Sequence, residues 1–591
     1  MEQRSDLGGA LKGRPVFAVF EGGGAKGIAH IGALRALEDG EADIQGVAGT
    51  SAGAIMAVLS AAGFEAAELF DHENKTTLFG NPDFPFRKVT DVLGANAWLQ
   101  LRVLRATGAI WAQAMRGGLG FIGLALAVIA LAWCTQAPAW AVLVGLFASI
   151  GLLALFVVGL ACLGMVSLQQ LRKNLNLILR WKCSQQQQNL PANEKNPALE
   201  ALIQEGSSEI TFAQAKALGW KPIKIVASNI TQGRIEVFSE ATTPHVSLAD
   251  AVAASICIPI LFRAIHLKPA AEAPHSAPSK PSGTPLEAAH HSYVDGGMLS
   301  NLPAWVFEEE RCLNPDAAVI AVELEAPPAT TQAPNRLSGL AFLGALVRTA
   351  IFGAGALSKR VRGLLIPLQL TPLKRNGEVL QLLEFDVDTL DAQGIISDAH
   401  TFAMERLVDQ LVRIPSELRE FTEGVRALFL NVIADEDLGS LFQTHGKPAH
   451  VRVAIATRPR NHLSSWKLHD GAGFDDSHPD REIYLPDPGS LVAKAVARGR
   501  ATLATKATLD NLCQEGGLAG QTLQANGWSE LCWSIAIPYS NGQTSAALVI
   551  DSNAELMQDE AVVEQELDLV LQSIQTEFDG LQQRIEGMEP R

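Results

Sequence analysis

The pentapeptide Gly49-Thr50-Ser51-Ala52-Gly53 decides how this chain is interpreted, because it separates two apolar runs of different kinds. The short, mostly apolar run at 44–48 predicts a strand, and the run at 54–59 predicts a buried helix. A G-x-S-x-G sequence at a sharp turn from strand to helix is typical of a nucleophile elbow. The pattern therefore makes Ser51 the candidate nucleophile at a helix N-terminus, where free N–H groups favour developing negative charge.

A glycine-rich loop lies upstream of the elbow and follows a second predicted strand. The apolar run at 16–20 predicts a central strand that leads into Glu21-Gly22-Gly23-Gly24-Ala25-Lys26-Gly27. Consecutive glycine N–H groups can form a cradle for an anion. The spacing is neither the G-x-G-x-x-G of dinucleotide folds nor a P-loop. We therefore expect Gly22, Gly23 and Gly24 to form an oxyanion hole, with a nucleotide-binding loop as the alternative.

A third motif, Asp295-Gly296-Gly297, follows Tyr293-Val294 and precedes the segment 298–303, which reads MLSNLP. A GGGxKG loop, then GTSAG, then DGG in this order resembles the patatin-like phospholipase family. The resemblance covers roughly residues 14–75 and 205–415. It implies a three-layer α/β/α hydrolase fold and activity on phospholipids or related lipids. No DxD or HExxH metal pattern appears, so we predict a hydrolase that needs no metal or other cofactor.

The resemblance also implies a Ser–Asp dyad in which Ser51 attacks an ester and Asp295 accepts its proton. In this scheme Gly49, Gly53, Gly296 and Gly297 are the motif glycines. A carboxylate needs burial in apolar surroundings to become a sufficient base. The residues leave two alternatives open: a triad completed by His30 or His245, and Asp250 as a competing base.

A foreign segment at 90–185 interrupts the expected catalytic domain, which comprises residues 1–80 and 200–430. The segment contains two charge-free apolar stretches, about 118–134 and 139–166, separated by a short gap with a proline. Such stretches predict a hairpin of two transmembrane helices. Basic residues flank the pair on both sides, which predicts that the catalytic and C-terminal domains are cytoplasmic at an inner or plasma membrane. The alternative is a helical hairpin buried in a soluble core.

The pattern changes after about residue 445. Alternating strands, a short helix at 491–498, a strand pair around Asn541-Gly542 and a long terminal helix at 559–581 predict an α+β domain at 445–591. This region looks like a GAF-type sensor domain. It suggests a small molecule or protein as regulator, and a homodimer as the oligomeric state.

Composition narrows the function classes further. The chain has 591 residues, a formal net charge of −16 and 48% hydrophobic residues. The negative charge argues against a nucleic-acid partner, since phosphate binding needs basic patches. The polar stretch at 1–13 lacks the apolar core of a signal peptide. We predict a membrane-anchored serine lipid acyl hydrolase of the phospholipase or lysophospholipase type, with a catalytically silent membrane scaffold as the alternative.

Overall fold

The structure is a computed structural model, and its chain divides into two compact units, residues 1–407 and 408–591. The structure describes residues 7–72, 74–94, 97–99, 166–189, 209–259, 261–268, 290–314, 316–324, 365–381, 384–458, 465–473, 484–515, 531–539 and 546–588.

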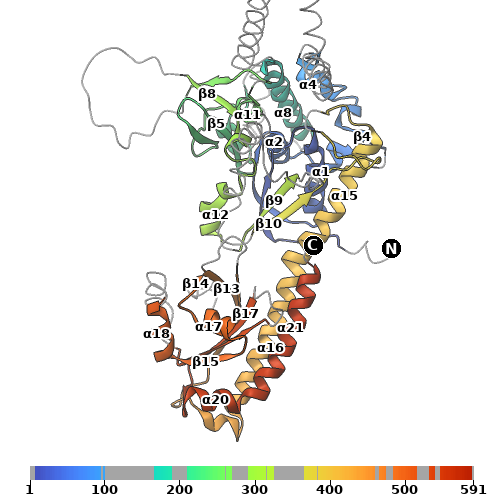
Figure 1. Ribbon diagram of the computed structural model, residues 1–591. Helices are drawn as coiled ribbons and strands as arrows, with labels where there is room; N and C mark the ends of the chain where they lie inside the picture. Colours follow the sequence, from blue (N-terminus) through green and yellow to red (C-terminus); the bar gives the residue numbers. More distant parts are fainter. Residues whose placement is uncertain are drawn as a thin grey trace, which may run out of the picture. The chain divides into compact units, whose positions relative to one another are not determined.

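The N-terminal unit is built on a mixed sheet in the order β10-β9-β1-β2-β5-β8-β7, with β6 also paired to β5 (Figure 1). Strands β10, β9, β1, β2 and β5 run parallel, whereas β6, β7 and β8 add antiparallel pairs. The parallel strands are β1 (Pro15–Phe20), β2 (Asp43–Thr50), β5 (Ile223–Asn229), β9 (Ala318–Leu324) and β10 (Leu365–Leu370); the others are β6 (Arg234–Phe238), β7 (Ile265–Leu267) and β8 (His291–Asp295).

Strand β5 brings the ends of β2 and β8 together. Thr50, the last residue of β2, pairs with Val226 in parallel register. Asp295, the last residue of β8, pairs with Ala227 in antiparallel register. Because β6 pairs with the other edge of β5 over Ile225 to Asn229, β2 and β8 meet end to end along a single edge. The register therefore places the residue after Thr50 close to Asp295.

Helical segments cover both faces of this sheet. Phe17 stacks on Phe307 of η4 (Ala304–Phe307), with ring centroids 4.5 Å apart. Side chains alternate between faces along a strand, so Phe20 points the other way and packs edge-on against His30 of α1 (Ala29–Asp39). The predicted α/β class and the strand at 16–20 are confirmed.

The remaining helices and short strands of the N-terminal unit connect or cover these strands. They are η1 (Gly24–Ile28), α2 (Ala52–Ala61), α3 (Ala66–Leu69), β3 (Phe70–Asp71), β4 (Thr76–Thr77), η2 (Leu78–Gly80), α4 (Val89–Leu93), α8 (Gln169–Asn189), α10 (Phe212–Ala217), α11 (Leu248–Ser255), η3 (Gly296–Met298), α12 (Glu308–Leu313) and α15 (Thr389–Val408).

The two ends of the predicted insertion 90–185 are joined to each other, and we call this junction the stem. The buried Asn174 of α8 donates from Nδ2 to the carbonyl oxygens of Asp91 and Val92, at 2.9 Å each. Gly94 lies so close to Gln170 that a Cβ added there would stand 2.9 Å from its Cγ. The stem thus holds α4 and the start of α8 side by side.

The C-terminal unit contains a six-stranded antiparallel sheet in the order β14-β13-β12-β17-β16-β15. Its strands are β12 (Val451–Thr457), β13 (Ser465–Ala472), β14 (Tyr484–Pro486), β15 (Thr502–Thr505), β16 (Trp533–Pro538) and β17 (Ala546–Ser552), and a separate pair is formed by β11 (Phe442–Gln443) and β18 (Glu555–Leu556). Its helices are η5 (Asp409–Arg413), α16 (Ile414–Ala434), η6 (Leu438–Leu441), α17 (Leu491–Arg498), α18 (Lys506–Glu515), α20 (Glu560–Glu566) and α21 (Asp568–Met588).

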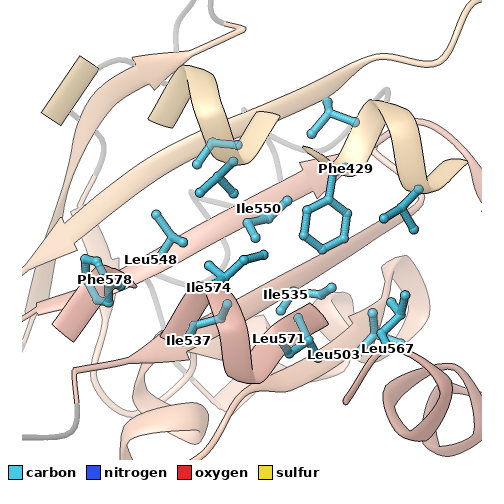
Figure 2. Packing of buried hydrophobic residues seen from close by; sticks show 14 of the residues in the cluster. Phe429, Leu503, Ile535, Ile537, Leu548, Ile550, Leu567, Leu571, Ile574 and Phe578 are labelled. Atoms are coloured by element: carbon cyan, nitrogen blue, oxygen red, sulfur yellow. The ribbon is translucent and has the colours of Figure 1, made fainter. Parts of the chain in front are cut away.

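The two faces of this sheet carry separate cores. On one face Ile535 and Ile550 pack with Phe429 of α16 and with Ile574 and Phe578 of α21 (Figure 2). The other face packs against α17 through a second cluster of buried residues. Strands and helices are combined here as the predicted α+β class requires.

The units divide after Leu407, so α16, most of which lies in the predicted catalytic range 200–430, packs in the C-terminal unit. Most of α8 lies in the predicted insertion 90–185, and this helix packs against α11 of the N-terminal unit. The predicted spans at 118–134 and 139–166 lie outside the described residues, except for Val166. Among the residues that are described, no helix combines the length and apolar character needed to cross a bilayer.

Candidate active site

Ser51 occupies a strained turn between β2 and α2. Its backbone angles are φ 54° and ψ −121°, a region that non-glycine residues rarely adopt. The flanking glycines explain how the turn closes. A Cβ on Gly49 would stand 2.2 Å from the carbonyl oxygen of Gly53, and a Cβ on Gly53 would stand 2.1 Å from that of Phe20. Both positions therefore require glycine, and the local geometry is that of the predicted elbow.

Asp295 lies beside Ser51, whose side chain lowers the pKa of the Asp295 carboxyl group. Both residues are buried, with 6% of Asp295 and 7% of Ser51 exposed. The Oδ1 atom of Asp295 accepts a 2.7 Å hydrogen bond from the N–H of Gly297. Burial raises the pKa of Asp295 to about 6, although the hydrogen bond from Gly297 and the nearby Ser51 side chain act in the opposite direction. The carboxylate is therefore a stronger base than an exposed aspartate.

The glycine loop lies over the nucleophile. A Cβ on Gly22 would stand 3.0 Å from the Cβ of Ser51, and one on Gly27 would stand 2.9 Å from that of Ala52. The loop therefore contacts both the elbow and the first residue of α2.

The N–H group of Gly22, predicted as an oxyanion donor, is occupied in this structure. It donates to the carbonyl oxygen of Asn301, at 3.1 Å. For Gly23 and Gly24, by contrast, the described part of the chain shows no acceptor for the N–H group. These two amides therefore remain available as hydrogen-bond donors.

Asn301 and Glu21 fix the glycine loop. The Nδ2 atom of Asn301 donates to Oε1 of Glu21 at 2.9 Å and to the carbonyl oxygen of Gly22 at 3.1 Å. The other carboxylate oxygen of Glu21 accepts a 2.6 Å hydrogen bond from the N–H of Leu324. The loop is thus tied to the segment after the DGG motif and to the end of β9.

The alternative bases lie elsewhere. His30 is fully buried and its Nε2 atom bonds to the carbonyl oxygen of Glu21; burial lowers its pKa to about 4. His245 is exposed. Asp250 forms an ion pair with Arg172 of α8, and burial raises its pKa. Of these four groups, Asp295 is the one whose carboxyl pKa responds to the Ser51 side chain.

The sequence predicts no role for Asn301, for Glu21 or for Ser255, whose Oγ atom accepts a 2.9 Å hydrogen bond from the N–H of Ser51. Asn301 lies in the segment 298–303 that follows the DGG motif, but that pattern assigns it no contact. Each contacts the site through partners far away in the chain, and neither composition nor spacing indicates such contacts.

Comparisons with known proteins agree with this architecture. Residues 18–308 match the model of the family described as patatin-like phospholipase. A search of the curated proteins gives no significant match.

Three solved structures were compared with the chain. The type III effector protein ExoU is 14% identical with a TM-score of 0.31, over 73% of this chain and 61% of that chain. VipD from Legionella pneumophila is 16% identical with a TM-score of 0.30, over 72% of this chain and 78% of that chain. Full-length ExoU in complex with SpcU, from the type III secretion system of Pseudomonas aeruginosa, is 18% identical with a TM-score of 0.29, over 68% and 53%. Residues 18–308 are therefore similar to the patatin-like phospholipase family.

Proposed function

We propose that this protein is a membrane-anchored serine hydrolase that cleaves acyl esters of phospholipids or lysophospholipids through Ser51 and Asp295. The observation that carries the proposal is that the strained elbow serine lies beside a buried carboxylate whose pKa is raised to about 6. The family match over residues 18–308 supports the substrate class.

The reaction follows from the roles of these groups. The Oγ atom of Ser51 attacks the ester carbonyl carbon while Asp295 takes the hydroxyl proton. The amides of Gly23 and Gly24 stabilise the oxyanion, and loss of one such donor typically costs about 2.7–4 kcal/mol of barrier. The acyl–oxygen bond then breaks, and Asp295 returns the proton to the leaving alcohol. Water, deprotonated by Asp295, hydrolyses the acyl-Ser51 ester and releases the fatty acid.

Membrane anchoring is part of the proposal and rests on the charge-free stretches at 118–134 and 139–166. The stem supports it, because Asn174 holds the two ends of the insertion together as a hairpin requires. An anchored site shortens the path of a lipid tail, whose transfer to water costs about 0.8 kcal/mol per CH₂. We further propose that both units lie on the cytoplasmic side and that the C-terminal unit is a GAF-like sensor that regulates the hydrolase.

A labelling experiment tests the chemistry. A fluorophosphonate probe should label wild-type protein at Ser51, and vesicles containing phospholipid or lysophospholipid should release fatty acid. Ser51→Ala should abolish both signals, and Asp295→Asn should reduce both strongly. The control is Ser60→Ala at the far end of α2, which should retain them. Wild-type protein that neither labels nor releases fatty acid would favour the catalytically silent scaffold.

A further inference from the structure

The C-terminal end of α11 makes backbone hydrogen bonds with both members of the Ser–Asp pair. The Oγ atom of Ser255 accepts a 2.9 Å hydrogen bond from the N–H of Ser51. Two residues later, the carbonyl oxygen of Cys257 accepts a 2.8 Å hydrogen bond from the N–H of Asp295. The two bonds therefore connect the nucleophile and the base to a segment of three consecutive residues.

Ser255 is also joined to the strand on which the pair is aligned. Its hydroxyl donates to the carbonyl oxygen of Val226 at 2.6 Å, so a single buried hydroxyl both accepts and donates. The same carbonyl oxygen lies against Gly296, where an added Cβ would approach it to 2.2 Å. Ser255 thus lies between the elbow and the turn that carries Asp295.

The strained conformation of Ser51 needs the hydrogen bond between its N–H group and Ser255. A residue at positive φ is strained and keeps its geometry only when its surroundings enforce it. The Ser51 N–H lies outside both the β2 ladder and the hydrogen bonds of α2, and without Ser255 it would be buried with no acceptor. Losing that bond would let the elbow relax and would move Oγ away from the carboxylate.

We propose that Ser255 is a positioning residue, and that the segment Ser255-Ile256-Cys257 sets the separation between the Ser51 hydroxyl and the Asp295 carboxylate. This inference rests on the proposed function, because it assigns a role within the same site. It concerns alignment of the pair, so kcat should respond more strongly than KM.

The test compares two serine-to-alanine changes at opposite ends of α11 in the full-length protein. Ser255→Ala removes the hydrogen bonds to Ser51 and Val226. Ser247→Ala removes the N-terminal cap of the same helix, where Oγ accepts from the N–H of Asp250, and does not touch the pair. Activity is measured with a dispersed short-chain ester, and folding is measured by thermal unfolding.

We expect Ser255→Ala to lower kcat roughly 10- to 100-fold with little change in KM. The acid limb of its pH–rate profile should move to higher pH, because the Ser51 side chain beside Asp295 lowers the pKa of that carboxyl group. Ser247→Ala should lose comparable thermal stability yet keep the wild-type kcat and profile. A Ser255→Ala enzyme with wild-type kcat and pH profile, or one that loses no more than Ser247→Ala, overturns the inference.

A second pair of variants covers the case in which Ser255→Ala does not fold. Ser255→Thr and Ser255→Val add nearly equal volume, but only threonine keeps the hydroxyl. Per folded molecule, the threonine variant should react with fluorophosphonate faster than the valine variant; equal rates would refute the inference. Failure of the proposed function is distinct, because wild-type protein itself would then show neither labelling nor hydrolysis.

Discussion

At the residue scale, the burial of Asp295 determines how activity should depend on pH. The carboxylate accepts a proton only when ionised, and burial raises its pKa to about 6. We therefore expect kcat/KM to fall about tenfold per pH unit below pH 6 and to level off above it. Release of fatty acid from a short-chain ester, measured between pH 4.5 and pH 8, checks this. A profile that stays flat down to pH 4.5 would exclude Asp295 as the base.

The same burial has a cost for stability. The pKa of Asp295 rises from 3.8 to about 6 on folding, so ionised Asp295 destabilises the fold by about 3 kcal/mol above pH 6. This cost declines as the pH falls from 6 to 4, because the folded protein then holds the proton. Asp295→Asn should accordingly raise the free energy of unfolding above pH 6 by up to that amount, and by almost nothing at pH 4. Unfolding at both pH values measures the difference, and an equal effect at each would contradict the argument.

At the scale of elements, backbone contact between β1 and the start of α2 explains the second motif glycine. Gly53→Ala would push a Cβ to 2.1 Å from the carbonyl oxygen of Phe20, and a backbone atom cannot move aside as a flexible side chain can. We expect a loss of about 1–3 kcal/mol in stability together with displacement of Ser51.

Gly394→Ala in α15 is the matched control for this change. An added Cβ there has no neighbour within 4 Å, so alanine should stabilise the helix by up to about 1 kcal/mol. Thermal unfolding and fluorophosphonate labelling of both variants provide the measurement. If the two variants showed the same thermal stability and the same labelling, the close packing at Gly53 would be unimportant for both stability and the position of Ser51.

The elements also explain which parts of the site could be predicted from the sequence. The elbow is local: an apolar strand, small residues and an apolar helix follow one another within about 16 residues, so periodicity and glycine spacing suffice. The hydrogen bond that occupies the Gly22 amide comes from Asn301, 279 residues away, and no local pattern records it. The role of Ser255 could not be predicted either, since the hydroxyl of a serine at a helix end usually forms hydrogen bonds only with nearby backbone groups.

At the scale of the whole molecule, the boundary of the C-terminal unit depends on α16. Its apolar face could be recognised from the sequence, but which sheet it covers could not. Val425, Phe429 and Val432 complete the core that contains Trp533, and the rings of Phe429 and Trp533 lie 6.0 Å apart. A domain limit drawn at residue 445 therefore removes part of that core.

Two fragments test this boundary. We expect the fragment 408–591 to unfold cooperatively and to be a soluble monomer or dimer. Residues 445–591 should aggregate or lack a cooperative transition, because three core residues on α16 are missing and apolar area is exposed. Circular dichroism with thermal melting and size-exclusion chromatography distinguishes these outcomes. Equal stability of the two fragments would show that α16 is dispensable.

The stem has a consequence for the insertion it closes. Since Asn174 already holds Asp91 and Val92 against α8, a short Gly–Ser bridge in place of residues 100–165 should leave both ends undisturbed. Such a protein should turn over a dispersed short-chain ester at the wild-type rate but no longer sediment with vesicles. Loss of turnover by a folded bridged protein would show that the excised segment contributes to chemistry. With turnover intact, membrane insertion and ester cleavage would be independent properties of separate segments of the same polypeptide.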